Sequence, residues 1–380
     1  MNSSRVDVCI RGSGAVGSSL ALALARQGLQ VAITAAPRVD PEAVLGADIR
    51  TYALNAASRQ LLEDLKVWPA LPADAVSAVH DMRVWGDAAG AGIEFSSWQQ
   101  GVEALAWIVD ASALDAALDA ALRFAPHVQP VVEAVAANLT VWADGKASAA
   151  ARALGVQVER HAYGQMALAA RLECDAPHGH VAWQWFRAPD VLALLPFDRP
   201  RAGHGFGLVW SMPTAQAQAM LALSDADFEA ALNAAVAAND TSARSPGALR
   251  LTGPRKAWPL SLAQAKPLCG RGWVLVGDAA HVVHPLAGQG LNLGLADVRS
   301  LAAVIAAREP WRSIGDEILL RRHVRARALP TLAMARMTDS LLHLFAADQP
   351  LLREFRNRGM SLLNHLAPLK RLLTARALDA

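Results

Sequence analysis

The feature that most constrains this chain is a strand–turn–helix–strand pattern near its N-terminal end. Residues 6–10 (VDVCI) and 28–33 (GLQVAI) are typical of buried strands, and a helix begins between them near Ala15. The turn before the helix carries three glycines with the G-x-G-x-x-G spacing, Gly12, Gly14 and Gly17. Such glycines permit a tight turn, close approach of a pyrophosphate and close helix packing, and the helix N-terminus attracts the phosphates. We therefore expect a dinucleotide-binding unit here.

Two residues of this unit are unusual. The second strand normally ends in Asp or Glu, which accepts hydrogen bonds from the adenosine ribose. Here Thr34, Ala35 and Ala36 follow, and the nearest acid is Asp40. Losing a hydrogen bond to a charged group lowers affinity about ten- to hundredfold. Arg11 also stands where an apolar strand residue would pack.

A second glycine-rich unit covers residues 273–294 (WVLVGDAAHVVHPLAGQGLNLG). Its strand, residues 272–277, ends at Asp278, which can accept hydrogen bonds from sugar-like hydroxyls. The residues expected to stiffen the loop, open the helix and present backbone N–H groups are Pro285, Gly288, Gly290, Leu291 and Asn292. A helix N-terminus stabilises negative charge such as that of a reduced flavin. The two units could therefore hold opposite ends of one FAD.

His281 and His284 form an H-x-x-H pair in the same loop. Zinc needs three or four protein ligands, and no cysteine or acid pair accompanies these histidines, so we predict no metal site. His284 could face the flavin as a base or hydrogen-bond donor. Scaffolding of the cofactor loop is the simpler role.

The composition limits the function and the location. A net charge of +2 gives no general case for nucleic-acid binding. The three cysteines are far apart, which favours a reducing cytoplasm over disulfides. No run approaches the roughly 20 apolar residues of a membrane-spanning helix. Residues 319–380, however, hold 11 Lys/Arg against 4 Asp/Glu, a balance of +7. This helical region is either a docking helix with a solvated basic face or an attachment to an anionic membrane surface.

Apolar residues alternate between residues 158 and 262, as in HVAWQWF and GFGLVWSM, with one helix from TAQAQAMLAL onward. This pattern predicts an antiparallel sheet that interrupts the cofactor fold and gives a substrate an apolar wall. We expect an α/β (α+β composite) fold of three parts. These are a Rossmann-like FAD-binding domain (1–79, 103–157 and 264–310), a substrate-binding sheet domain (80–102 and 158–263) and a C-terminal helical region (311–380).

The stretch GDAAHVVHPLAGQGLNLGLAD (277–297) closely resembles the second FAD-binding signature of the flavoprotein aromatic hydroxylases. Its sequence is most similar to that of the ubiquinone-biosynthesis hydroxylase branch (UbiH/UbiF type). Other matching stretches follow in the same order along the chain: IRTYALNAASRQLLEDLKVW (49–68), MRVWGD (82–87), WIVDASALDAAL (107–118), VAWQWF (181–186), LALLPF (192–197) and LRRHVRAR (320–327).

The resemblance implies a role for each matching residue. Gly12, Gly14, Ala15 and Gly17 would meet the pyrophosphate, and Arg50 would lie near the phosphates or the flavin. Asp144 matches an Asp-Gly motif that serves both FAD and the nicotinamide donor. Asp278 would bind the ribityl chain. The loop and helix residues Pro285, Gly288, Gly290, Leu291 and Asn292 would lie at the flavin ring.

The chain also departs from the family pattern. Ala151 stands where the family usually has Arg, with Arg152 following it. The stretch between residues 119–125 (DAALRFA) and Asp144 is short. It leaves room for about one strand where a β-meander of three or four is expected.

The resemblance implies an FAD-dependent monooxygenase that hydroxylates a polyprenylated phenol on the route to ubiquinone. NAD(P)H would reduce FAD, and a C4a-hydroperoxyflavin would attack the electron-rich ring. The enzyme would be cytoplasmic, peripheral to the inner face of the membrane, and a partner in a biosynthetic complex. The alternatives are a hydroxylase of the same fold with another aromatic substrate, a weakly FAD-binding scaffold without activity, and a plain NAD(P) dehydrogenase. The last leaves residues 273–294 unexplained.

Overall fold

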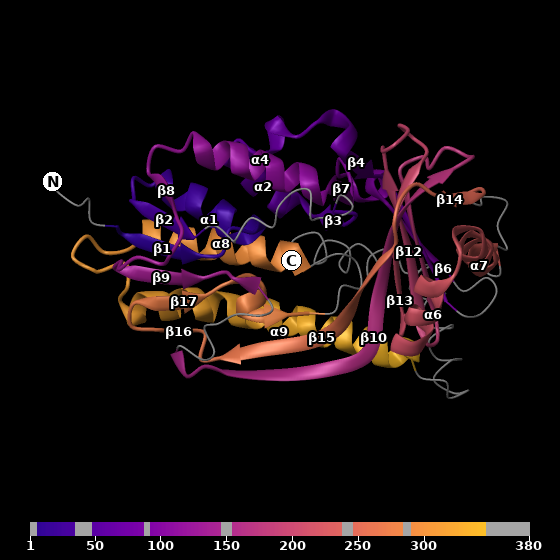
Figure 1. The fold of residues 1–380 in the computed structure, drawn as a ribbon. Helices are drawn as coiled ribbons and strands as arrows, with labels where there is room; N and C mark the ends of the chain where they lie inside the picture. Colours follow the sequence, from indigo (N-terminus) through magenta and orange to yellow (C-terminus); the bar gives the residue numbers. More distant parts are fainter. Residues whose placement is uncertain are drawn as a thin grey trace.

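The computed structural model of the chain describes residues 6–34, 48–86, 92–145, 154–237, 246–283 and 290–346. Within these ranges the chain forms three sheets (Figure 1). A helix-covered parallel sheet lies at one end of the molecule and a large, mainly antiparallel sheet at the other. A small sheet lies between them. This confirms the expected mixed α/β fold.

Six strands in the described ranges build the parallel sheet. In sheet order they are β16 (Cys269–Gly270), β17 (Trp273–Leu275), β9 (Leu139–Trp142), β1 (Val8–Arg11), β2 (Val31–Thr34) and β8 (Val128–Val131). All neighbours are parallel except β16 and β17. Val8 is in register with Val31 on one side and Leu139 on the other, so β1 lies inside the sheet. Both predicted strands of the N-terminal unit therefore form and pair.

Helices pack on this sheet through one apolar core. They are α1 (Ala15–Ala25), α2 (Ala56–Asp64), α4 (Ala111–Arg123) and α8 (Gly290–Ala306). Asp110 begins α4 by accepting a hydrogen bond from the Ala113 N–H at 3.0 Å. The buried α4 residues, among them Leu114 and Leu118, recur at helical spacing and face the core. The face of the sheet that carries Val8 lies in the same core.

The antiparallel sheet has nine strands in the described chain. They are β5 (Asp81–Trp85), β6 (Gly92–Ser96), β10 (Gln157–Cys174), β11 (Val181–Arg187), β12 (Asp190–Phe197), β13 (Gly205–Pro213), β14 (Leu249–Leu251), β15 (Lys256–Lys266) and β18 (His281–Val282). Their order is β18–β15–β10–β13–β12–β11–β5–β6, with β14 also pairing β10. Only β5 and β11 pair in parallel. The alternating pattern thus predicted this sheet correctly.

One expected helix of this region is two helices. They are α6 (Thr214–Ala222) and α7 (Asp225–Ala237), separated at Leu223 and Ser224. Leu223 has extended backbone angles, and the Ser224 hydroxyl accepts a hydrogen bond from the Asp227 N–H at 3.2 Å. The break is therefore set by a serine cap, which a continuous run of helix-forming residues conceals.

The small sheet has the order β3–β7–β4. Its strands are β3 (Thr51–Leu54), β4 (Val76–Val79) and β7 (Ala106–Asp110), all antiparallel to their neighbours. Leu54 packs in the core of the parallel sheet, whereas Ala53 packs in a cluster with residues of the antiparallel sheet. This sheet therefore joins the two larger ones, one face toward each.

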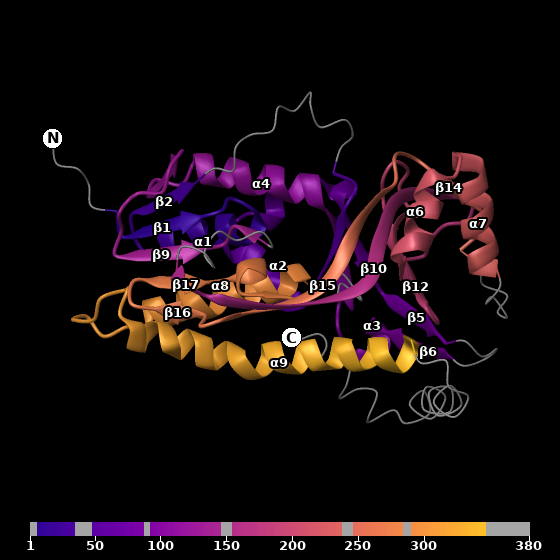
Figure 2. The ribbon, with the colours of Figure 1, turned by 60° about the horizontal axis from the view of Figure 1, so that its bottom comes forward.

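The remaining elements are mostly short. They are α3 (Ser97–Gln100) and three 3₁₀ turns, η1 (Trp68–Ala70), η2 (Ala73–Ala75) and η4 (Gly277–Ala279). The exception is α9 (Glu317–Ala346), which runs along the body of the molecule (Figure 2). Leu319 and Leu320 are buried on the side of α9 that faces the body of the molecule. The rest of the predicted C-terminal helical region, residues 347–380, lies outside the described residues.

The β-meander expected beside the cofactor fold is replaced by a bare loop. The segment predicted to leave room for one meander strand instead supplies β8 and β9 of the parallel sheet. Residues 132–138 connect these strands across β2 and β1. Parallel strands usually need a dozen or more connecting residues because the connection contains a helix. This connection is shorter because it contains none.

Candidate functional site

The first glycine-rich loop lies where β1 meets α1. Gly12 has φ +113°, and a Cβ built on it would lie 2.4 Å from the Ala143 carbonyl oxygen. A Cβ on Gly17 would lie 1.9 Å from the Gly12 carbonyl oxygen. The loop can therefore close only with glycine at both positions. The same contact brings the backbone of Asp144 against Gly12, because the Asp144 nitrogen is 2.8 Å from that Gly12 Cβ position.

The N-terminus of α1 is open toward solvent. Gly14 is its N-cap, with no side-chain cap, and a Cβ on Gly14 would meet nothing within 4 Å. The first turn, which begins at Ala15, carries no acidic residue. Unpaired backbone N–H groups and the helix dipole together favour a bound anion at such a terminus. The loop thus has the geometry and the charge that a pyrophosphate requires.

Thr34 and Arg11, the two unusual residues of this unit, have structural roles. The Thr34 hydroxyl accepts a hydrogen bond from the Gly12 N–H at 3.1 Å. Thr34 therefore stabilises the loop. Up to Thr34, the second strand has no Asp or Glu that could accept hydrogen bonds from the adenosine ribose. Asp40 lies outside the described residues. The Arg11 guanidinium lies 3.9 Å from the ring centroid of Trp142, so cation–π stacking replaces the expected apolar contact.

The second loop is held by a buried carboxylate. Asp297 on α8 accepts hydrogen bonds from the Gly277 N–H at 3.0 Å, His281 Nε2 at 2.8 Å and Arg327 Nε at 2.8 Å. Gly277 has φ +61°, and half-buried Asp278 follows it in η4. Asp297 therefore fixes the backbone on which Asp278 is presented.

Asp297 is paired with two basic side chains. Burial alone would raise the pKa of Asp297, but attraction from His281 and Arg327 outweighs it and holds the pKa well below its ordinary value. Burial would lower the pKa of His281, and Asp297 raises it. His281 is thus part of the scaffold that holds the second loop. The described residues contain no group of three His, Cys, Asp or Glu able to hold a metal ion.

The two loops touch through Val16 of α1. A Cβ on Gly294 would lie 2.5 Å from Val16 Cγ2, and one on Gly277 would lie 3.2 Å from Val16 Cγ1. Gly294 and Gly277 therefore let α8 and η4 approach α1 closely. Loops that begin more than 250 residues apart in the chain therefore lie side by side.

Asn292 ties α8 to β3. Its side-chain N–H donates to the Ala53 carbonyl at 2.8 Å, and its carbonyl oxygen accepts from the Asn55 N–H at 3.1 Å. The side chain is buried by these bonds, so only the backbone of Asn292 is left for a ligand. A Cβ on Gly290, at the start of α8, would meet nothing within 4 Å. Of the remaining predicted loop residues, His284, Pro285 and Gly288 lie outside the described residues.

Arg50 lies just before β3 and forms an ion pair with Asp48. The Arg50 Nε is 2.9 Å from Asp48 Oδ1, and 47% of the arginine side chain is exposed. The Asp48 hydrogen bond raises the pKa of Arg50 further above its ordinary value. Burial raises the pKa of Tyr52 to about 12, Arg50 lowers it, and Asp278 adds to the rise. Tyr52 therefore lies within electrostatic reach of both Arg50 and Asp278.

An apolar cavity of about 30 Å³ lies beside Ala53, between the small sheet and the antiparallel sheet. It is lined by Ala53, Val79, Met82, Ala106, Ile108, Ala182, Trp183, Gln184, Ala193 and Leu195. Four of these residues are alanines, which leaves space between the sheets. The lining is apolar apart from Gln184, and it lies next to the strand that Asn292 holds.

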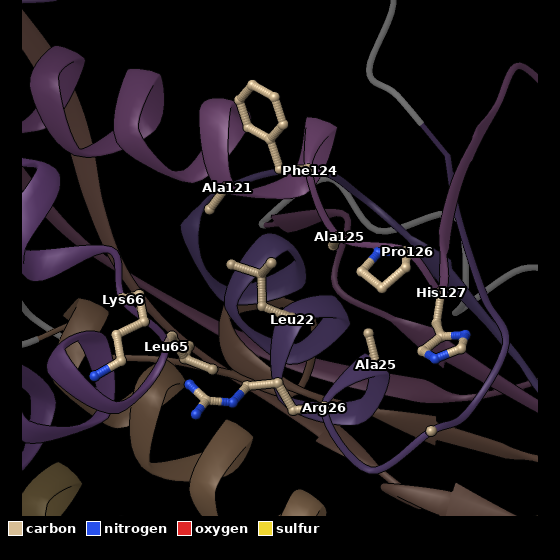
Figure 3. Close-up of a pocket in the computed structure, with 11 residues that line it drawn as sticks. Leu22, Ala25, Arg26, Leu65, Lys66, Ala121, Phe124, Ala125, Pro126 and His127 are labelled. Atoms are coloured by element: carbon tan, nitrogen blue, oxygen red, sulfur yellow. The ribbon is translucent and has the colours of Figure 1, made fainter.

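A second hollow of about 560 Å³ lies at the C-terminal ends of α1, α2 and α4 (Figure 3). Arg26, Lys66 and His127 border it, and Phe124 at its rim is 88% exposed. None of the predicted site residues lines it. It is therefore separate from the two loops.

Known proteins share this architecture. Residues 119–329 match the family described as "FAD binding domain". A solved structure of PqsL, a probable FAD-dependent monooxygenase from Pseudomonas aeruginosa, superposes with a TM-score of 0.76 at 20% identity. The match covers 94% of this chain and 99% of PqsL. The chain thus carries an FAD-binding domain, and its fold is the one that a probable FAD-dependent monooxygenase adopts.

Two relatives define the family. Ubiquinone hydroxylase UbiL of Rhodospirillum rubrum is 30% identical over 98% of this chain and 89% of its own length. The 3-demethoxyubiquinol 3-hydroxylase of Escherichia coli is 29% identical over 98% of both chains. The chain belongs to the ubiquinone-biosynthesis hydroxylase family (UbiH/UbiF type) and is an FAD-dependent monooxygenase of ubiquinone biosynthesis.

The sequence did not single out three residues of this region. Asp297 and Gly294 lie within the resembling stretch, and their spacing of three residues puts them on one face of α8. Tyr52 follows Arg50 in a stretch that also carries the resemblance. Asp297 could have been suspected as a charged residue in an otherwise apolar helix.

Proposed function

We propose that this monooxygenase hydroxylates the ring of a polyprenylated phenol, with FAD held across both loops and NAD(P)H as electron donor. The observation that carries the proposal is the packing of Val16 against both Gly277 and Gly294, which brings the two loops side by side. A single long cofactor that spans both loops needs them to be this close. The residues around the cavity beside Ala53 give its wall an apolar character, although its volume of about 30 Å³ is far smaller than that of an aromatic ring.

The chain's residues fit FAD at each end. The open N-terminus of α1, with Gly12, Gly14, Ala15 and Gly17, would hold the pyrophosphate. Arg50 would contact the phosphates or the flavin. Asp278 would accept hydrogen bonds from the ribityl hydroxyls, and the start of α8, at Gly290, Leu291 and Asn292, would offer backbone N–H groups to the ring. When bound, FAD supplies the electron and oxygen chemistry.

The protein itself supplies orientation and a dry environment. The hydrogen bonds of Asn292 hold β3 against α8, so the ring site and the apolar cavity keep a fixed relation. The apolar residues around Ala53 would exclude water from a substrate that packs against them. Within the described residues, the only glycine-rich βαβ unit is that of β1 and β2. The nicotinamide donor would therefore bind transiently to the same domain, with Asp144 as one contact.

The substrate class comes from the relatives and the cavity together. UbiL is a ubiquinone hydroxylase, and the Escherichia coli relative hydroxylates 3-demethoxyubiquinol. A precursor of this kind has a phenolic ring and a long prenyl tail. The lining of the cavity beside Ala53 contains no charged side chain that could pair with the carboxylate of a small aromatic acid.

The test uses the purified full chain, FAD, NADH or NADPH, O₂ and a prenylated phenol. We expect a yellow protein whose flavin is reduced by the donor and a product that has gained one oxygen by mass spectrometry. A protein that stays colourless with added FAD would overturn the proposal and favour the scaffold without activity. Hydroxylation of a small aromatic acid alone would favour another substrate.

The same proposal includes contact with the membrane that holds the substrate, at its cytoplasmic face and within a biosynthetic complex. No helix of the described chain is both long and apolar enough to span a membrane. The outer face of α9 exposes Arg321, Arg325 and Arg336, and residues 318–338 contain no acid. Basic residues near an anionic surface contribute about 1 kcal/mol each.

Flotation with anionic vesicles tests this contact. The full chain should float with them and should remain in solution with vesicles of neutral lipid. A chain lacking residues 351–380 should float less, because it has lost six basic residues: Arg353, Arg356, Arg358, Lys370, Arg371 and Arg376. Equal recovery of both chains in the soluble fraction would contradict membrane contact.

A further inference from the structure

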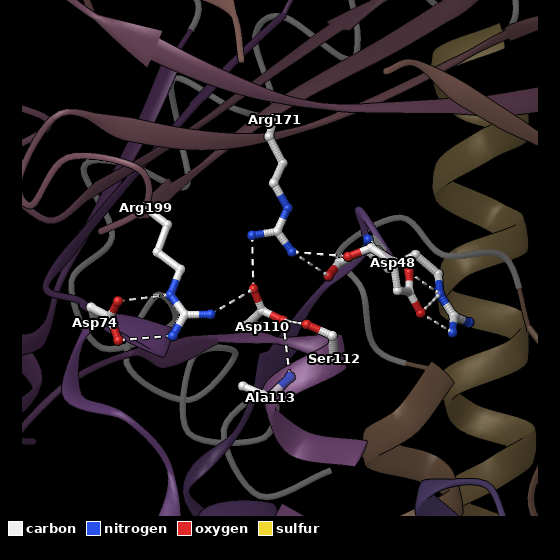
Figure 4. Close-up of polar contacts among 8 residues, drawn as sticks. Asp48, Asp74, Asp110, Ser112, Ala113, Arg171 and Arg199 are labelled. Atoms are coloured by element: carbon white, nitrogen blue, oxygen red, sulfur yellow. Dashed lines mark hydrogen bonds and ion pairs between the residues drawn. The ribbon is translucent and has the colours of Figure 1, made fainter. Parts of the chain in front are cut away.

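Arg171 belongs to β10 of the antiparallel sheet, but its guanidinium reaches the start of β3 (Figure 4). Its Nη2 donates to the Asp48 carbonyl at 3.1 Å and to the Arg50 carbonyl at 3.4 Å. Its Nη1 lies 2.8 Å from Asp110 Oδ2. One side chain thus contacts three residues on two segments outside its own sheet. A planar guanidinium with five donors is suited to this task.

Asp110 holds the Arg171 guanidinium in a fixed position. Its side chain is 3% exposed, and it caps α4 through the Ala113 N–H and accepts from the Ser112 hydroxyl. Burial would raise the pKa of Asp110, but these hydrogen bonds and Arg171 lower it. A charged, buried carboxylate with several fixed partners does not move easily. The position of Arg171 is therefore set by the N-terminus of α4.

A second contact from the same sheet supports the start of β3. Gly207 of β13 is the cross-strand partner of Arg171. A Cβ on Gly207 would lie 2.6 Å from the Thr51 hydroxyl oxygen, so Thr51 packs directly on the glycine backbone. Arg171 and Gly207 together hold residues 48–51 from one side. The Ala111 N–H, which donates to the Arg50 carbonyl at 3.2 Å, holds them from the other.

We infer that Arg171 is a positioning residue, which places Arg50 for its contact with the cofactor. The inference rests on the proposed role of Arg50 toward FAD. Arg171 donates to the carbonyl groups of Asp48 and of Arg50 itself. The Arg50 side chain, in contrast, remains half exposed. The antiparallel sheet, through Arg171, thus determines where the Arg50 side chain lies.

Arg199 provides a matched control for this inference. It also contacts Asp110, with Nη1 3.4 Å from Oδ2, and it pairs with Asp74 through two hydrogen bonds. It has no contact with the backbone of residues 48–50 among the described interactions. Losing Arg199 removes a charge from the same cluster but leaves the start of β3 held.

The experiment measures FAD dissociation constants by flavin fluorescence, and melting temperatures, for the full-length apoprotein and its variants. Arg171→Gln should raise the dissociation constant of FAD about tenfold, because a displaced Arg50 loses its charged contact with FAD. Arg171→Lys should be intermediate, since one ammonium cannot reach all three acceptors. Gly207→Ala should also weaken binding, without any change of charge. Arg199→Gln should stay within about threefold of wild type even if its melting temperature falls equally.

The double variant Arg171→Gln/Arg50→Gln decides how Arg171 acts. If Arg171 acts through Arg50, the double variant should bind FAD no more weakly than Arg50→Gln alone. Additive losses, an unchanged dissociation constant in Arg171→Gln, or an equal loss in Arg199→Gln would overturn the inference. An unchanged constant in Arg50→Gln would overturn it together with the proposed role of Arg50. Normal FAD binding without hydroxylation would overturn the proposed reaction only.

Discussion

Asp48 forms an ion pair with Arg50, whose guanidinium we propose to contact the cofactor. The Asp48 carboxylate and Arg50 are two residues apart and form a paired contact through two arginine nitrogens. A phosphate that binds Arg50 must share it with this carboxylate. Asp48→Asn should therefore tighten FAD binding several-fold, by roughly 0.5–1 kcal/mol for a half-exposed pair. The gain should shrink as salt is added, because screening weakens exposed pairs. Equilibrium titration at low and high salt measures both effects.

Asp74→Asn is the control for this variant. It removes the partner of Arg199, which lies away from the start of β3, and should leave FAD affinity unchanged. Weaker binding by Asp48→Asn at both salt concentrations would contradict the competition. It would show instead that Asp48 orients Arg50 toward the cofactor.

Single residues differ in how far the sequence predicts them. Gly12 and Gly17 were predictable because each answers a local backbone need, a positive φ or a close approach. Arg171, Asp110 and Arg50 meet across 60 or more residues of chain, and no periodicity records such a contact. The cofactor roles of Arg50, Asp144 and Asp278 stay predictions.

The second loop, α8 and α9 depend on one carboxylate. Removing one partner from a buried ion pair costs about 3–5 kcal/mol, because the remaining charges lose their compensation. Asp297→Asn should destabilise the protein by about 3 kcal/mol and weaken FAD binding as well, because Gly277 and His281 lose their shared acceptor. Urea denaturation of apoprotein and FAD-loaded protein gives both numbers.

Asp225→Asn is the matched acid-to-amide change. Asp225 pairs with Arg255 at 3.1 Å, but its side chain is 78% exposed. Its loss should change the free energy of unfolding by less than ~1 kcal/mol. If both variants unfold at the same urea concentration as wild type, Asp297 does not hold the loop.

Strands and helices were predicted best where their periodicity is strong. β1, β2 and the long strands of the antiparallel sheet follow their alternation. β8 was missed as a sheet strand because VQPV is short and contains Pro130, which is tolerated at the sheet edge it occupies. The β3–β7–β4 sheet was missed because its partners are remote in sequence. The α6–α7 break depends on one serine cap.

The stability of the entire fold should fall in acid through His323, which is buried where α9 packs on α8. Its Nδ1 is 2.9 Å from the Ser300 hydroxyl oxygen. Burial lowers the pKa of His323 to about 4, against a weaker raising effect of Asp297. The unfolded chain binds this proton near pH 6.5, so the folded state loses about 3 kcal/mol as the pH falls from about 7 to about 4.

His323→Gln should remove this part of the pH dependence. The free energy of unfolding of wild type should fall relative to that of the variant across this range, as measured by urea denaturation at several pH values. His161→Gln, a change at an exposed histidine, should retain the wild-type dependence. Parallel curves for wild type and His323→Gln would contradict the prediction.

The order of strands in the parallel sheet has a consequence for biosynthesis. β9 ends at Trp142, but its neighbour β17 begins only at Trp273, about 130 residues later. The whole of β10 to β15 leaves the ribosome in between. During that interval the nascent chain carries an open strand edge, which invites wrong pairing. The arrival of β17 and then α8 closes the sheet and completes the second loop. The time needed to translate residues 143–272 therefore sets how long the edge of β9 stays unpaired.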